Sequence, residues 1–295
     1  MTTTTIVTTD DLLDPIGYIE EVTEDSFPNG TLTFPGPLQD FTFLPSRARK
    51  IIDDTGSQDI REIIDGALVG VTDMTLGVVD TTFLKYVTEL PSGTGDISKS
   101  LAMAARVKVG AGTVYYKATM ARAAVGWIAG GLDQDTMMGA TFRHNFDMPT
   151  TLAGITMTTD PGKTSKPTWK WSDGGGTPVL WGAADVDILG LRVDFNRHLV
   201  SRANTGGSIL AINRSGGRTI TFQMVAGWKS QTLYTDLVGT AYKDLAWTLK
   251  TGSGTLTLTD CKIMAPIPYR FRPPTQTGYE VVQAVTGAAV SAAVT

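Results

Sequence analysis

Two histidines, His144 and His198, are the residues best suited to acid–base or metal chemistry, and they lie in different halves of the chain. A catalytic or metal site needs histidine together with partners at a defined spacing. The sequence contains no H-E-x-x-H, C-x-x-C, G-x-S-x-G or Walker pattern. We therefore predict surface or structural roles for both histidines. We also predict no catalytic, cofactor-binding or metal-binding residue, and a protein that is not an enzyme.

The acidic pairs Asp133/Asp135 and Asp185/Asp187 offer carboxylates, but a calcium loop needs more oxygens in a fixed order. We interpret them as solvated side chains of loops or strands. The single cysteine, Cys261, can form no disulfide within the chain. Its apolar neighbours predict a packed, inert thiol.

Two glycine-rich sequences, GAGT at 110–113 and GSGT at 252–255, have the composition of short phosphate-binding loops. Each leads into a strand-like segment, whereas phosphate loops lead into the N-terminus of a helix. We therefore interpret both as turns.

Charged and aromatic residues also suggest contact surfaces. The basic sequence PSRARK (45–50) is followed at once by several acidic residues, which favours mixed-charge contacts with another subunit over phosphate binding. Trp169 and Trp171 would share one face of a strand, and they fit either contact with a neighbouring surface or packing in the core.

The composition indicates a β-rich protein. The chain has 295 residues, of which 42% are hydrophobic and 18% charged, and its net charge is -4. Threonine and glycine, which favour strands and turns, take the place of the missing charge. The negative charge disfavours a protein that binds duplex DNA through basic residues. The N-terminal sequence has no secretory pattern, so we expect a protein made in the cytoplasm, with no membrane partner.

Alternating sequences predict strands, among them 191–196, 219–224 and 255–263. In the second of these, Ile220, Phe222 and Met224 should point inward. In the last of these the apolar phase changes after Asp260, which predicts a β-bulge. Helical spacing predicts two helices, at 80–90 with Asp80 as its N-cap and at 230–245 with Ser230 as its cap.

The two halves repeat one order of elements. An alternating segment (66–79 or 216–227) precedes each predicted helix, and a strand, a Gly-x-Gly-Thr turn and a long strand follow it. Lys108 and Lys250 take equivalent places before the turns. We predict an internal duplication. The fold class is mainly β, with two tandem β-barrel or sandwich modules, one flanking α-helix for each, and extended N- and C-terminal arms.

The predicted divisions follow from this order. They are an N-terminal arm (1–30), a first β-barrel (31–158), a linker (159–179), a second β-barrel (180–272) and a C-terminal tail (273–295). Each half also has a long polar excursion, at 45–62 and at 196–208. Loops of this length in compact domains are often functional.

The sequence GTLTLTDCKIMAPIPY (254–269), which runs from a turn through a strand into prolines, resembles the last barrel strand of bacteriophage tail tube proteins. The duplicated barrel with one helix and a long early hairpin loop resembles the two-barrel tail tube proteins of long, non-contractile-tailed phages. This resemblance extends over 31–272. It also fits the inner tubes of contractile tails and of the related secretion system.

The resemblance implies a virion protein of the phage tail, assembled in the host cytoplasm. Trimeric rings with six-fold pseudo-symmetry would stack into a hollow tube for double-stranded DNA, which passes without specific binding. The implied partners are further copies of the chain, the tape-measure protein and tail-end proteins. An acidic, threonine-rich lumen would repel phosphate. The long loops would contact the adjacent ring through these residues: Arg47, Arg49, Lys50, Asp53, Asp54, Arg61, Arg197, Arg202 and Asn204.

Other functions remain open at this stage. Another virion component, such as a tail terminator or capsid decoration protein, would share the composition. A carbohydrate-binding β module could use Trp169 and Trp171 as its platform. A β-rich hydrolase would have to rely on carboxylates alone.

Overall fold

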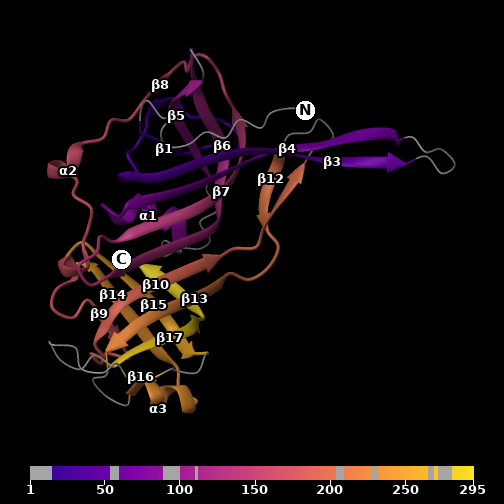
Figure 1. Cartoon of the computed structure of the whole chain (residues 1–295). Coiled ribbons are helices and arrows are strands. Elements are labelled where there is room, and N and C mark those ends of the chain that lie inside the picture. The colour runs from indigo at the N-terminus through magenta and orange to yellow at the C-terminus, as the bar shows by residue number, and fades with distance from the viewer. Residues whose placement is uncertain are drawn as a thin grey trace.

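The structure is a computed structural model that describes residues 15–53, 60–88, 100–109, 112–203, 209–227, 232–264, 269–271 and 281–295. The backbone alone is described for 46–53, 60–68, 109, 163, 203, 209–210, 213–214, 269–271 and 281–283. Antiparallel strands make up most of it, as predicted (Figure 1). No helix among these residues has both the length and the apolar character needed to cross a lipid bilayer.

The first half forms a sheet in the order β3-β4-β7-β6-β5-β1, with helix α1 between β4 and β5 in the chain. Its elements are β1 (Gly17–Glu20), β3 (Leu38–Asp53), β4 (Ile60–Gly77), α1 (Thr81–Thr88), β5 (Leu101–Val109), β6 (Gly112–Gly131) and β7 (Met137–Asp147). Asp80 caps α1 as expected, because its Oδ1 accepts the amide of Thr82 at 2.9 Å.

The second half repeats this pairing in the order β10-β13-β17-β15-β14-β9, with helix α3 between β13 and β14 in the chain. Its elements are β9 (Val179–Trp181), β10 (Ile188–Asn196), β13 (Thr219–Gly227), α3 (Thr232–Val238), β14 (Lys243–Lys250), β15 (Gly254–Ile263) and β17 (Val281–Ala289). The same order of pairing in both halves confirms the predicted duplication.

Shorter elements complete the fold. They are β2 (Gly30–Thr31), β8 (Ile155–Thr156), α2 (Gly162–Ser165), the 3-10 turn η2 (Trp171–Gly174), β11 (Leu199–Ala203), β12 (Ile209–Arg214), β16 (Tyr269–Phe271) and β18 (Ser291–Val294).

The two glycine-rich sequences join equivalent hairpins, as predicted. Val109 pairs with Gly112 where β5 leads to β6, and Lys250 pairs with Gly254 where β14 leads to β15. The predicted bulge is also present, because the register of β14 and β15 shifts beside Asp260, whose φ is 53°. In β6 the register breaks in the same way at Met120, whose φ is 56°.

Register extends the correspondence between the halves to single residues. In the first half Thr72 of β4 pairs with Phe142 of β7, which pairs with Ala123 of β6. In the second half the equivalent strands β13, β17 and β15 place Phe222, Gly287 and Ile263 in these positions.

The halves are joined in one sheet by a strand pair that we call the seam. The C-terminal part of β6 pairs with β10, from Val125 opposite Asn196 to Gly131 opposite Gly190. One hydrophobic core also runs through both halves. The predicted barrels at 31–158 and 180–272 are therefore halves of one sheet, because the strand after the linker continues the sheet instead of starting another.

The predicted arms and linker lie partly within the fold. In the N-terminal arm β1 pairs with β5, and in the C-terminal tail β17 and β18 pair with β13 and β15. Residues 281–294 thus complete the second half, because β17 takes the place that β7 has in the first. Trp169 and Trp171 of the linker are buried in the core, which confirms the second of their two interpretations.

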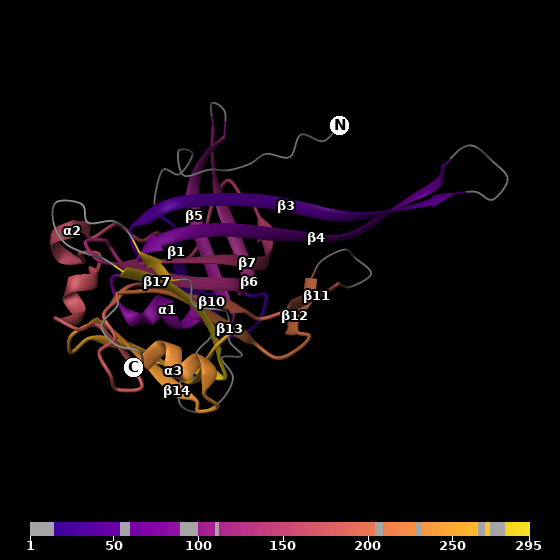
Figure 2. The ribbon, with the colours of Figure 1, turned by 60° about the horizontal axis from the view of Figure 1, so that its bottom comes forward.

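Two further predictions need correction. The second helix ends at Val238, because Gly239 follows and Lys243–Lys250 pairs with β15 and β9. Its predicted cap, Ser230, lies outside the described residues. The excursion at 45–62 is mostly strand, since β3 and β4 continue as a hairpin that projects from the body (Figure 2). The second excursion forms β11 and β12, on the side from which this hairpin projects.

Candidate functional site

The candidate site is the face of the sheet that points away from the core. Strand β13 shows how the sequence builds it: Thr219, Thr221, Gln223 and Val225 are exposed, while the residues between them are buried. This alternation confirms the predicted inward positions of Ile220, Phe222 and Met224. Because side chains alternate across a strand, one row of polar residues covers one row of core residues.

The register carries this polar face across the seam and through both halves. One row of paired residues crosses five strands without a break, and it consists of Asp73, Thr141, Val125, Asn196 and Thr219. The next row consists of Thr75, Gly139, Trp127, Asp194, Thr221 and Ala288. The polar face is therefore a property of the whole sheet and is rich in threonine.

Two charges on the polar face, Arg192 and Asp194, are paired with each other. Arg192 donates to both oxygens of Asp194, with Nη2 at 2.8 Å from Oδ1, and its guanidinium lies 4.7 Å from the ring centroid of Trp127. Asp73 accepts a hydrogen bond from Thr141. Arg143 lies opposite Val71, on the row that borders the Asp73 row on its other side. The face thus carries both signs of charge.

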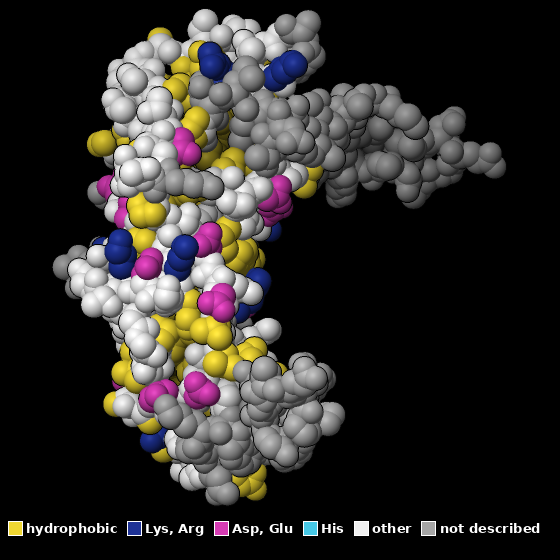
Figure 3. All heavy atoms as spheres, turned by 60° about the vertical axis from the view of Figure 1, so that its left-hand side comes forward, with side chains coloured by type: hydrophobic (Ala, Val, Ile, Leu, Met, Phe, Trp, Pro, Cys, Tyr) yellow, Lys and Arg dark blue, Asp and Glu magenta, His cyan; other side chains and the backbone are white. Residues whose placement is uncertain are grey.

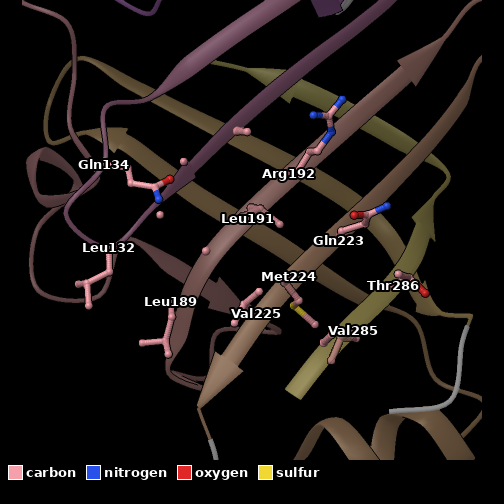
Figure 4. Close-up of a pocket in the computed structure, with 15 residues that line it drawn as sticks. Leu132, Gln134, Leu189, Leu191, Arg192, Gln223, Met224, Val225, Val285 and Thr286 are labelled. Carbon is pink, nitrogen blue, oxygen red and sulfur yellow. The ribbon is translucent and has the colours of Figure 1, made fainter. Parts of the chain in front are cut away.

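A hollow of about 450 Å³ lies on this face near the seam (Figure 4). Arg192, Gln223 and Thr286 point into it from three adjacent strands, and Leu132, Leu189 and Val225 line its other end. Among the described residues that line it, Arg192 is the single charged one, and it is held by Asp194. The hollow therefore offers hydrogen bonds and apolar contact but no pair of titratable groups.

Comparison with known proteins returned no match, either to a protein-family model or to a curated protein. In the described part of the chain, no three His, Cys, Asp or Glu residues gather as metal ligands would. The acidic pairs lie in turns, where the amide of Asp187 donates to Asp185 at 2.9 Å. On another side of the molecule, acidic and basic side chains are interspersed (Figure 3).

The residues predicted to contact an adjacent ring do not form one group. Arg47, Arg49, Lys50 and Asp53 lie along β3 and Arg61 lies on β4, in the projecting hairpin where the backbone alone is described. Arg202 is exposed on β11. Asp54 and Asn204 lie outside the described residues.

Arg197 is a correction to that set, because it is buried and 2% exposed. Its guanidinium donates to the carbonyl oxygens of Ala123 at 2.6 Å and Val87 at 2.6 Å, and of Tyr86 at 2.9 Å. Its amide donates to the carbonyl of Ala124 at 3.0 Å. The side chain thus binds β6 and the C-terminal end of α1, and it has no surface left for another ring.

His144 is structural, as expected, at the centre of a buried polar group. Its Nδ1 donates to the carbonyl of Asn145 at 3.0 Å, so its Nε2 accepts from Thr72 at 2.8 Å or Tyr116 at 3.1 Å. Burial lowers the pKa of His144 to about 4, so the imidazole is neutral at pH 7. His198 is exposed and lies 3.2 Å from Thr219 Oγ1.

Cys261 is fully buried, and burial raises the pKa of its thiol to about 12. The thiol is therefore unreactive, as expected.

Sequence reasoning missed two buried charged groups. Glu21 is 4% exposed and accepts the amide of Met120 at 3.0 Å and the hydroxyl of Ser100, which supports the bulge in β6. Burial raises the pKa of its carboxyl. The other group is Arg197. A signal for it was present, because Arg47 takes the same place in the first half that Arg197 takes in the second.

Proposed function

We propose that this chain is a structural protein of a phage virion that forms the tail tube. Rings of the chain, each a trimer with six-fold pseudo-symmetry, stack into a hollow tube through which DNA passes. The chain acts by assembly and carries out no reaction.

The seam is the observation that carries the proposal. It joins two halves of the same topology edge to edge, so that β10 extends the sheet of the first half. Applied again between chains, the same contact would extend the sheet further and close it as a ring. A ring of three chains then contains six equivalent halves, two from each chain.

The ends of the sheet support repetition of the seam. Among the described residues β3 pairs with β4 alone, so its other edge is open. An open strand edge is a template for pairing with another chain. Such an edge is a hazard in a monomer and an advantage in a protein that assembles.

The hairpins support stacking of the rings. The β3–β4 hairpin projects beyond the body of the sheet, and β11–β12 lies on the same side (Figures 1 and 2). In a closed ring, all hairpins of this kind would point in one direction and reach the next ring.

The polar face suits the lining of the tube. Its threonines are uncharged, and Arg192 is neutralised by Asp194, so few free cations face a phosphate backbone. Strong DNA binding needs many such cations to release counterions. DNA could therefore slide along this face without being held.

Negative-stain electron microscopy of the purified protein over a range of concentrations tests the proposal. We expect hollow tubes of constant width with stacked rings, and three chains for every six lobes of a ring. The control is Asp194→Asn, which should form the same tubes because the substitution lies on the face that lines the lumen. Particles that never polymerise would contradict the proposal and favour a terminator or decoration protein.

A further inference from the structure

We propose that Arg47 of one chain docks on the second half of another chain as Arg197 docks on the first half within the chain. The occupant of this docking surface is a second copy. The inference rests on the proposed assembly and adds the residues of the lateral contact.

The seam within the chain provides the template. Arg197 follows β10 and binds three carbonyl oxygens, of which two belong to the C-terminal end of α1 and one to β6. A cation is favourable at a helix C-terminus, where carbonyl dipoles converge. Gly126 of β6 allows this approach, because a Cβ there would lie 2.1 Å from the carbonyl oxygen of Val87.

The β11–β12 hairpin completes the template by covering β6 beside the bulge. Leu199 and Ile212 of the hairpin pack against Met120 and Ala124 of β6 in a small separate cluster. Ala124 is therefore buried by the second half, although it lies on the outer side of the first.

Register places Arg47 where Arg197 stands. Thr42 pairs with Asp73 as Arg192 pairs with Gln223. Along β3, β4 and α1 the residues correspond to those of β10, β13 and α3 at one constant shift in residue number. This shift also matches Met74 and Gly77 of β4 to Met224 and Gly227 of β13, and it matches Arg47 to Arg197.

The receiving surface on the second half is exposed and apolar. The counterparts of Ala123 and Ala124 in β6 are Ile263 and Met264, by the same pairing to the neighbouring strand. Ala124 is 9% exposed, whereas Met264 is 71% exposed. Ala124, which the seam covers in the first half, thus has an uncovered counterpart in the second half, Met264.

The end of the helix shows the same contrast. Thr88, the last residue of α1, is fully buried, and its carbonyl oxygen accepts a hydrogen bond from Arg218 at 3.2 Å. Its counterpart Val238, the last residue of α3, is 66% exposed. Leu84 is fully buried, and its counterpart Tyr234 is 49% exposed. Val238, Tyr234 and Met264 are therefore exposed at the positions that a second copy of the seam would cover.

The charge of the partner fits this surface. Arg47 would bring a guanidinium to the carbonyl end of α3 and to the carbonyl oxygen of Ile263, as Arg197 does for α1 and Ala123. The contact between chains would repeat the seam that each chain already contains, so it would use the same kinds of residue and hydrogen bond.

The first test is Arg47→Ala, with Lys108→Ala, at an exposed basic residue of β5 away from the seam and from the β3–β4 and β11–β12 hairpins, as the matched control. Loss of the charged hydrogen bonds should raise the concentration needed for assembly about tenfold or more, as seen by sedimentation velocity. Lys108→Ala should assemble like the wild type. The thermal melt of the unassembled chain should be the same for both variants, because Arg47 lies at an open edge.

The second test is cross-linking in a Cys261→Ala background. Arg47→Cys and Met264→Cys on separate chains should give disulfide-linked dimers when mixed, and both changes on one chain should give linked trimers. Lys108→Cys with Met264→Cys is the control and should stay unlinked.

The outcomes separate this inference from the proposed function. Wild-type tubes with neither an Arg47→Ala effect nor a cross-link would overturn the inference and leave the proposed function intact. A cross-link in a protein that forms no tubes would support the lateral contact and contradict the tail tube.

Discussion

Two equivalent pairs of strands, β4 with β7 and β13 with β17, fill the core with opposite choices of residue. In the first half Gly70 lies opposite His144 and Thr72 opposite Phe142, so the large side chains are on β7. In the second half Ile220 lies opposite Ala289 and Phe222 opposite Gly287, so the large side chains are on β13.

The fit in each pair is close. A Cβ at Gly70 would lie 2.2 Å from His144 Cε1, and one at Gly287 would lie 2.2 Å from Phe222 Cζ. Cross-strand neighbours on one face must share a fixed volume, so a large residue requires a small one opposite. The two halves therefore share the close packing of this strand pair, although different residues achieve it in each half.

The pairs also differ in polarity. Thr72, Tyr116 and His144 form a buried hydrogen-bonded group in the first half. The corresponding residues of the second half are Phe222, Leu256 and Ala289, which are apolar. A buried polar group is tolerated when its hydrogen bonds are made, and the first half makes them.

The largest expected effect tests whether both large aromatic residues support one core. Phe142→Ala and Phe222→Ala should each lower the free energy of unfolding by about 3–5 kcal/mol, because each leaves a cavity. Each should shift a single transition in denaturant titration followed by circular dichroism, since the core runs through both halves. Two separate transitions would show that the halves unfold independently.

A pH titration tests the polar group that only the first half has. The pKa of His144 is lowered from 6.5 to about 4, so the unfolded chain binds this proton first. The free energy of unfolding should therefore fall by about 3 kcal/mol from this residue as the pH drops from 6.5 to 4.

His144→Gln should remove that loss and leave a flatter profile in urea titrations at each pH. Glu21 acts in the opposite direction, because its raised pKa favours the folded state at low pH. The difference between wild type and variant isolates His144. Parallel profiles would contradict a neutral, buried imidazole.

The seam is tested by Arg197→Ala, which should lower the free energy of unfolding by about 2–3 kcal/mol. The substitution leaves the carbonyls of Ala123 and Val87 without this donor. Thermal melts of Arg197→Ala and Arg47→Ala measure the comparison directly, since the second should be unchanged in the unassembled chain. Equal losses of stability in the two variants would show that Arg47 does not make between chains the contact that Arg197 makes within the chain.

The smallest effect concerns a single hydroxyl. Thr72→Val should cost about 1–2 kcal/mol, because Tyr116 and His144 keep each other as partners at 3.1 Å. Thr221→Val, at an exposed hydroxyl of β13, is the control and should cost less. Urea titration at pH 7 compares the two, and a neutral Thr72→Val would show that the buried group contributes no net stability.

Local pattern predicted much of the fold, because the signals involved are short. Alternation identified β10, β13 and β15, and the change of phase at Asp260 identified the bulge. The second helix was predicted too long, since Leu245 fits a helical stripe but pairs with Leu258 in the sheet. Helical spacing there was overridden by strand pairing, which depends on residues distant in the chain.

The candidate site was less predictable. Arg197 looked like a residue of a polar loop, and its burial depends on α1 and β6, which lie far from it in sequence. The C-terminal residues looked like a tail because small apolar residues do not identify their partner strand. The local sequence pattern therefore identifies neither the elements that bury Arg197 nor the strands that pair with the C-terminal residues.

By itself, the sequence determined a β-rich chain in which one order of strands and helix occurs twice, because period-two alternation and glycine turns are local properties. Only the tertiary structure decided that the two halves share one sheet. Strand pairing such as that of β6 with β10 is made by backbone amides and carbonyls, which are common to almost every residue and therefore do not specify their partner.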